Sequence, residues 1–60
     1  MPSYEYRVWI EDSNGQAIHL LQTDDGNVAI HLYLTIQHSR KYLQTRTNYS
    51  NEWKTLTLAD

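Results

Sequence analysis

The side chains best suited to chemistry in this sequence are aromatic rings, histidines and an arginine that alternate with apolar residues. Tryptophan, tyrosine and arginine dominate binding hot spots because each combines a large contact area with a polar group. Histidine adds a ring whose charge changes near neutral pH. The alternation predicts one surface that binds a protein partner through six of these residues: Trp9, His19, His31, Tyr33, Arg46 and Trp53.

A second interpretation is binding of single-stranded DNA or RNA, in which aromatic rings stack on bases and cations hold phosphates. The residues that fit these roles best are Arg40, Lys41, Tyr42, Arg46 and Lys54. The first thirty residues carry one base against five acids, whereas the second thirty carry four bases against two acids. Because the whole chain has a net charge of -2, the sequence favours protein binding over a role that neutralises many phosphates.

Catalytic and metal-binding chemistry find little support in the sequence. The chain has no cysteine, and no serine lies in a recognisable nucleophile motif. Asp24 and Asp25 fit turn chemistry better than an acid–base pair. His19 and His31 lack an evident third ligand, which makes them a poor metal site. We therefore expect a non-catalytic protein that uses neither a metal nor a cofactor.

The segment 27–37 shows the clearest pattern among the elements that must position the recognition residues. Val28, Ile30, Leu32 and Leu34 alternate with smaller or polar side chains along this segment. A period of two is typical of a strand with one apolar face. The segment is therefore predicted to be the central strand of a sheet.

Two further strands are predicted before this segment, at 4–11 and 16–22, because both alternate in the same way. The loops between the strands are predicted to hold three residues each, since a two-residue loop would pair apolar side chains with the wrong face. Each loop ends in a glycine, Gly15 or Gly26, which is expected to adopt a positive φ. The resulting register includes the pairs Ile10–Ile18 and Val8–Leu20.

The second half of the chain is predicted to add two more strands, at 41–49 and 53–58. Threonine and tyrosine favour a strand in the first of these, and a helix over 36–46 is the alternative. Tight turns at Ser39-Arg40 and Ser50-Asn51 would connect the strands. The pairs expected from these turns are Ile36–Leu43, Leu34–Thr45, Thr45–Leu56 and Leu43–Leu58.

These elements predict a single all-β domain over residues 1–60, a five-stranded antiparallel meander. No helix remains to cover its apolar face, so the sheet is expected to curl into a small barrel or half-barrel, or to be completed by dimerisation. The predicted core consists of Tyr6, Val8, Ile10, Ile18, Leu20, Val28, Ile30, Leu32, Leu34, Ile36, Leu43, Leu56 and Leu58.

The opposite face of this predicted sheet carries the recognition residues. Its register places Trp9 beside His19, His19 beside His31, and Asn48 beside Trp53. Two neighbouring histidines would repel each other once both are protonated, so partner binding is expected to weaken as pH falls.

The chain is therefore interpreted as a small protein-binding module, such as an inhibitor, adaptor or assembly subunit. A domain of 60 residues has a small core, which favours association into a homodimer. No apolar run approaches the ~20 residues of a membrane span, and the N-terminus lacks signal-peptide features. We therefore expect a cytoplasmic location.

Overall fold

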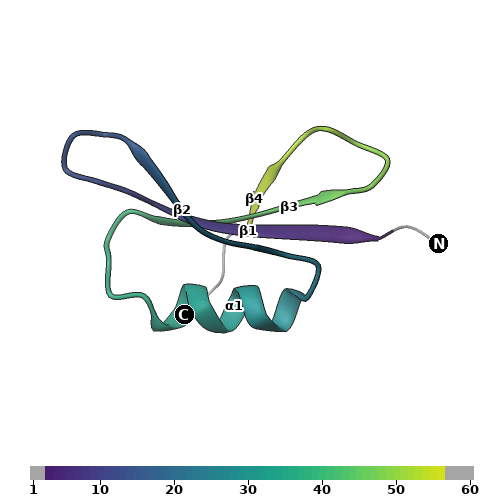
Figure 1. Cartoon of the computed structure of the whole chain (residues 1–60), viewed down its shortest axis with the longest axis horizontal. Coiled ribbons are helices and arrows are strands. Elements are labelled where there is room, and N and C mark those ends of the chain that lie inside the picture. The colour runs from purple at the N-terminus through teal and green to yellow at the C-terminus, as the bar shows by residue number, and fades with distance from the viewer. Residues whose placement is uncertain (1–2, 57–60) are drawn as a thin grey trace.

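The fold is an open antiparallel sheet with one short helix, as seen in a computed structural model that describes residues 3–56 (Figure 1). The sheet has four strands in the order β2-β1-β3-β4. Along the chain the elements are β1 (Tyr4–Glu11), β2 (Ala17–Thr23), α1 (Gly26–Thr35), β3 (Lys41–Thr47) and β4 (Lys54–Leu56).

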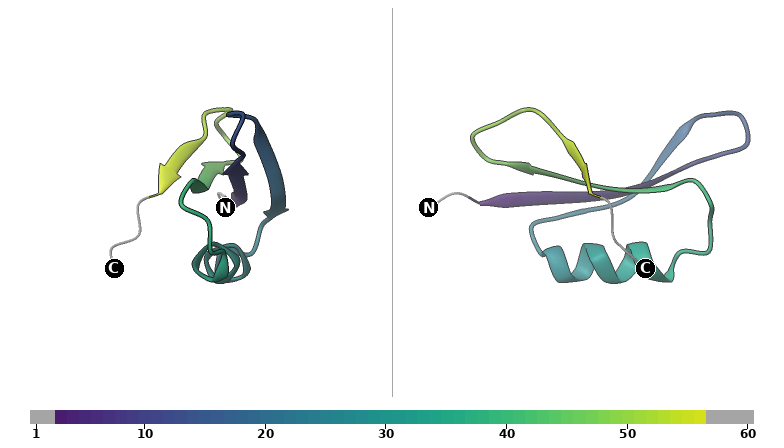
Figure 2. Two further views of the ribbon diagram at one scale, coloured as in Figure 1. Left: turned by 90° about the vertical axis from the view of Figure 1, so that its left-hand side faces the viewer. Right: turned by 180° about the vertical axis from the view of Figure 1, so that it is seen from behind.

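Helix α1 packs against one face of the sheet, where it contacts β1, β2 and β3. The end-on view in Figure 2 shows α1 on one side of the strands, and no described element covers the other side. The described strands form one open sheet that is not closed into a barrel. The all-β class predicted for the chain is confirmed only in part, because the described residues are mostly sheet but include α1. The predicted five-stranded meander and barrel are not confirmed.

The segment predicted as the central strand is instead α1, so that prediction was wrong. The Asp25 carboxylate caps the helix by accepting hydrogen bonds from the backbone N–H groups of Asn27 (3.0 Å) and Val28 (3.4 Å). The residues that α1 and its C-cap turn toward the sheet include Ala29, Tyr33 and Ile36, at helical spacing. The apolar residues of this segment therefore fit both the strand period of two and the helical period of about 3.6. The Asp25 cap and the contacts with the sheet favour the helix.

A lysine from β3 completes the other end of α1. The Lys41 Nζ donates hydrogen bonds to the backbone carbonyls of Tyr33 (2.9 Å) and Ile36 (3.0 Å). It also lies 4.7 Å from the centre of the Tyr33 ring. A cation at this end satisfies carbonyls that lack helical partners and interacts favourably with the helix dipole.

The first hairpin confirms the predicted three-residue loop. Gly15 has φ +80°, and Ile10 pairs with Ile18 as expected. Beyond that pair a β-bulge shifts the register, so Val8 faces Leu21 instead of Leu20. A bulge adds one residue to one strand and reverses the alternation beyond it. This irregularity brings Leu21 to the core and leaves Leu20 44% exposed.

Replacing Gly15 by valine is expected to lower the free energy of unfolding by about 1–2 kcal/mol, because a β-branched residue resists positive φ. A Cβ at this position would meet no atom within 4 Å, so the loss would come from backbone strain alone. Urea denaturation of both proteins measures the change. An unchanged midpoint would contradict the conformation assigned to this turn.

Gly26 does not adopt the positive φ predicted for it, because it begins α1 and does not end a hairpin loop. A Cβ there would lie 3.0 Å from the Cζ atom of the Tyr6 ring. The glycine therefore allows a close approach between the start of the helix and β1.

The strand predicted over 41–49 is confirmed as β3, so the alternative helix over 36–46 is excluded. Its neighbours differ from the prediction, because β3 pairs with β1 on one side and with β4 on the other. Leu43 faces Val8 and Leu56, not Ile36. The predicted partner Leu58 lies outside the described residues. The pairing of β3 with β4 is shifted by two residues from the prediction, since Thr45 faces Lys54 and not Leu56. An even shift keeps each side chain on its predicted face.

The core lies between α1 and the sheet and is small. Val8, Ala29 and Leu43 are fully buried among the described residues. Partly buried neighbours pack against them, namely Tyr6, Leu21, Ile30, Leu32, Tyr33, Ile36 and Leu56. Four residues predicted in the core are instead exposed, with fractions of 43% (Ile18), 44% (Leu20), 47% (Val28) and 60% (Leu34). Within residues 3–56 no helix has the length and apolar character needed to span a membrane.

Candidate functional site

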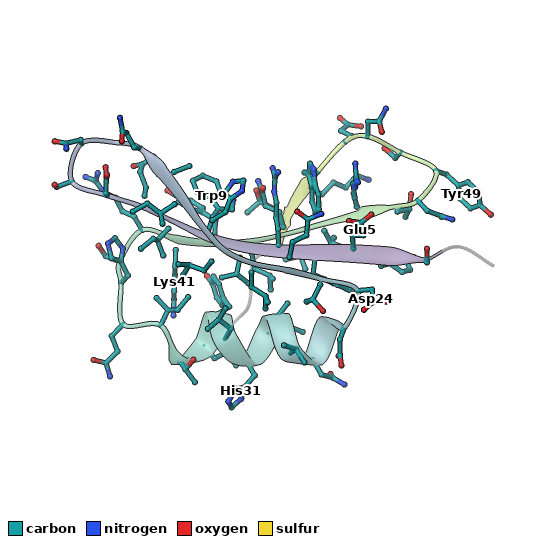
Figure 3. The ribbon with its side chains drawn as sticks, viewed as in Figure 1. Glu5, Trp9, Asp24, His31, Lys41 and Tyr49 are labelled. Atoms are coloured by element: carbon teal, nitrogen blue, oxygen red, sulfur yellow. The ribbon has the colours of Figure 1, made fainter. Side chains whose placement is uncertain are left out.

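Figure 3 shows Trp9 on the sheet face opposite α1. Further aromatic and arginine side chains contact one another on this face. They come from β1, β3 and the residue before β4, because alternate positions of these strands point away from the core. All are half-buried, and we call this group the open-face platform: Arg7, Trp9, Tyr42, Gln44, Arg46 and Trp53.

One half of the platform is a stack of two aromatic rings. Trp9 of β1 and Tyr42 of β3 face each other in the register, and their ring centres are 4.4 Å apart with planes at 25°. His19 of β2 extends the row, with its ring centre 6.3 Å from that of Trp9. Offset stacks of this kind add about 0.5–1.5 kcal/mol beyond area burial.

The other half is a tryptophan whose ring contacts two arginines. The guanidinium carbon of Arg7 lies 4.2 Å from the centre of the Trp53 ring, and that of Arg46 lies 4.9 Å from it. A cation near an aromatic ring is attracted by the negative face of the π-system. Both arginines are thereby held at fixed positions on the surface.

Gln44 connects the two halves through hydrogen bonds. Its Oε1 accepts from Arg7 Nε (2.6 Å) and from Trp9 Nε1 (3.0 Å), and its Nε2 donates to Thr55 Oγ1 (3.1 Å). These bonds cross β1, β3 and β4, so several rotamers are fixed together. A surface whose side chains are already ordered loses less conformational entropy when a ligand binds.

Glu5 borders the platform and accepts hydrogen bonds from Gln22 Nε2 (2.9 Å) and from the Arg46 guanidinium (3.2 Å). The hydrogen bond from Gln22, together with the hydrogen bond and positive charge of Arg46, lowers the pKa of this carboxyl below its ordinary value of 4.5. A carboxyl with a lowered folded-state pKa stabilises the fold above the unfolded-state pKa. That contribution disappears as pH falls through the folded-state value.

We therefore expect the unfolding temperature to fall from about pH 5 to about pH 3, and to fall less steeply in Glu5→Gln, which has no charge to lose. Thermal unfolding followed by circular dichroism across this range gives both slopes. Glu52→Gln, at an exposed glutamate outside these contacts, is the matched control. Equal slopes in Glu5→Gln and the native chain would contradict the assigned contacts.

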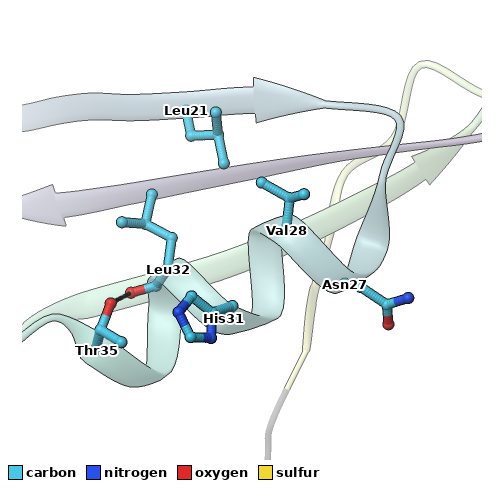
Figure 4. A pocket seen from close by; sticks show the side chains of 6 residues that line it. All are labelled: Leu21, Asn27, Val28, His31, Leu32 and Thr35. Carbon is cyan, nitrogen blue, oxygen red and sulfur yellow. Dashed lines mark hydrogen bonds between the residues drawn. The ribbon is translucent and has the colours of Figure 1, made fainter.

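The structure brings four of the six predicted partner-binding residues to this face: Trp9, His19, Arg46 and Trp53. The other two lie on α1, on the opposite side of the sheet. Tyr33 packs against the core, and His31 is exposed beside a hollow between α1 and β2 (Figure 4). The predicted neighbours His19 and His31 therefore lie on opposite sides of the sheet. Partner binding was expected to weaken as pH falls because these two histidines would be neighbours, and the structure removes that reason.

The residues predicted for nucleic-acid binding are divided between the two faces. Tyr42 and Arg46 belong to the platform, whereas Lys41 is bonded to carbonyls of α1. Lys54 faces Thr45, which lies on the α1 side of β3. Arg40 precedes β3 and pairs with Glu11 at 3.4 Å. These cations do not form one track for a phosphate backbone.

Arg7 and Gln44 are functional candidates that the sequence did not predict as site residues. Each lies next to a buried core residue on its strand, and this alternation is the sequence feature that could have identified both as residues of the open face. Their pairing depends on β3 lying beside β1, and the predicted topology separated those two strands. In the expected sheet the two residues therefore lay on the first and fourth strands, which are not neighbours.

No group of three histidine, cysteine or acidic side chains within residues 3–56 is arranged to hold a metal ion. The platform offers rings, guanidinium groups and amides, which suit recognition by stacking and hydrogen bonding. No family model matches this chain, and no curated protein or solved structure matches it.

Proposed function

We propose that this chain is a small, non-catalytic module that binds a protein partner through the open-face platform. The observation that carries the proposal is the ordered cluster of two tryptophans, one tyrosine and two arginines on a sheet face that no described element covers. These residue types are the ones enriched at binding hot spots.

The order of the platform supports recognition more than simple shielding of the sheet. Cross-strand pairs on a solvated face contribute roughly 0.2–1 kcal/mol each and require no common network. Here Gln44 bonds to both halves, and the Trp53 ring contacts two arginines. The free protein thus already presents rigid rings with fixed polar edges.

The charge around the platform indicates the chemistry of the partner. Arg7 and Arg46 are positive, while Glu5 pairs with Arg46 at 3.2 Å and Glu11 lies on the same face of β1. The positive and negative groups are balanced. A folded protein surface with apolar or aromatic groups and a few carboxylates suits this balance better than a polyanion does.

Single-stranded nucleic acid is the second candidate, because the Trp9–Tyr42 stack offers an aromatic platform on a sheet. Titrating a labelled oligonucleotide at about 50 and about 200 mM salt separates the two functions. For a protein-binding module we expect no saturable binding at either concentration. Tight binding that weakens steeply with salt would replace the first proposal by the second.

The direct test uses the immobilised chain as bait and quantitative mass spectrometry of the captured proteins. A specific partner is expected to be captured by the native chain and lost with Trp9→Ala. Tyr49→Ala is the matched aromatic control, because Tyr49 is 74% exposed and lies outside the platform. Equal capture by all three chains would contradict binding through the platform.

A further inference from the structure

Strand β2 forms an unprotected edge of the sheet. It pairs with β1 on one side, and no described strand lies on its other side. Its sequence, AIHLLQT, contains no charged residue and no proline. Natural edge strands are commonly protected by such residues against pairing with another chain. At the opposite edge, the described part of β4 includes Lys54.

An apolar hollow of about 500 Å³ runs beside this edge, between β2 and α1 (Figure 4). Leu21, Val28 and Leu32 line it, together with Asn27, His31 and Thr35. Val28 is 47% exposed, and Ile18 and Leu20 of the same edge strand are 43% and 44% exposed. An edge with free backbone groups therefore lies next to an exposed apolar surface.

The β-bulge restricts which self-pairings of β2 are possible. Ile18, opposite Ile10, is on the α1 side and His19, beside Trp9, is on the open side. Beyond the bulge, Leu21 is on the α1 side and Gln22, bonded to Glu5, is on the open side. Antiparallel pairing of two copies must place like faces together. One register that does so places His19 opposite Gln22 of the second copy.

We propose that β2 pairs antiparallel with β2 of a second copy about a two-fold axis perpendicular to the sheet. The same register places Leu20 opposite Leu21 of the second copy, and Ile18 opposite Thr23 of the second copy. A two-fold contact of this kind is self-complementary and closed, so it covers both β2 edges without forming a fibre.

The two-fold axis also brings the two hollows together. Both helices lie on one side of the continuous sheet, with the two β1 strands about 14 Å apart, which is three strand spacings. Two helices placed over these strands would be farther apart than the about 8–10 Å between the axes of packed helices. The apolar side chains of both β2 strands would lie in the space between the two helices. Both open-face platforms lie on the other side, so the dimer presents two binding surfaces in the same direction.

The size of this surface fits a modest interface. It consists of the seven residues of β2 and five further residues of the hollow. Specific interfaces at the lower end of the size range bury about 600 Å² per partner. The interface uses a different surface from the platform, so it goes beyond the proposed function and either proposal can fail alone.

Sedimentation velocity from low to high micromolar concentration tests the dimer. The native chain is expected to reach twice its mass of 7.1 kDa, and Leu20→Lys is expected to stay monomeric because it places a charge at the centre of the pairing. Leu34→Lys is the control, since Leu34 is 60% exposed on α1 and does not line the hollow. A native chain that stays monomeric throughout would overturn the proposal.

A cross-linking measurement tests the register and does not depend on how Leu20→Lys folds. His19→Cys and Gln22→Cys chains are oxidised separately and as a mixture. Only the mixture is expected to give a disulfide-linked dimer, because identical positions would be about 10 Å apart along the strands and a disulfide needs Cα atoms within about 7 Å. Equal cross-linking in all three samples, or none in the mixture, would overturn this register.

Discussion

Leu43→Ala is expected to unfold most of the protein at room temperature. Leu43 is fully buried between Val8 on β1 and Leu56 on β4, beneath α1. Truncating a buried leucine costs about 2–5 kcal/mol, and a domain of this size commonly has only about 3–5 kcal/mol of stability. Circular dichroism and urea denaturation measure the loss.

Leu34→Ala is the matched control for this experiment, because it makes the same chemical change at a leucine that is 60% exposed. Its effect is expected to stay within about 0.5 kcal/mol. If both variants lost the same stability, the core would not lie between α1 and the sheet.

Removing the Trp53 side chain is expected to abolish partner capture while leaving most of the fold intact. Trp53 is held by Arg7 and Arg46 on the open face, outside the buried core. Loss of a hot-spot aromatic costs about 2 kcal/mol or more, which corresponds to a roughly 30-fold or greater loss of affinity. Titration calorimetry with the captured partner measures this change, and thermal unfolding measures the fold.

Tyr49→Ala again serves as the control, with affinity and stability close to those of the native chain. The opposite pattern in Trp53→Ala would be low stability with unchanged affinity. That result would mean that Trp53 acts as a packed layer over the sheet and that the partner binds another surface.

The first hairpin shows what local sequence can predict. Gly15 at positive φ and the pair Ile10–Ile18 follow from a loop length and an alternation that involve neighbouring residues. Three of the four strands in the described sheet were likewise predicted at or near their observed bounds. The last strand was predicted over 53–58, and the described part of it covers Lys54–Leu56.

The segment 27–37 shows where alternation is insufficient. Its apolar residues satisfy a period of two, but Ala29, Tyr33 and Ile36 also satisfy the helical period. Asp25 was assigned to a turn, although the same carboxylate caps the helix. The choice between strand and helix depends on contacts with β3 and with β1, and β1 is distant in sequence.

The sequence by itself determined which side chains are available for recognition and that most of them alternate along strands. It also determined the Gly15 turn, because backbone sterics act within a few residues. The tertiary structure alone decided that α1 packs on one face of the sheet, that β3 lies beside β1, and that a bulge turns Leu21 to the core. The pairing of β1 with β3 brings Trp9 to Tyr42 and Arg7 to Gln44. The sequence did not predict this pairing, because pairing between distant strands depends on the whole core and not on either strand alone.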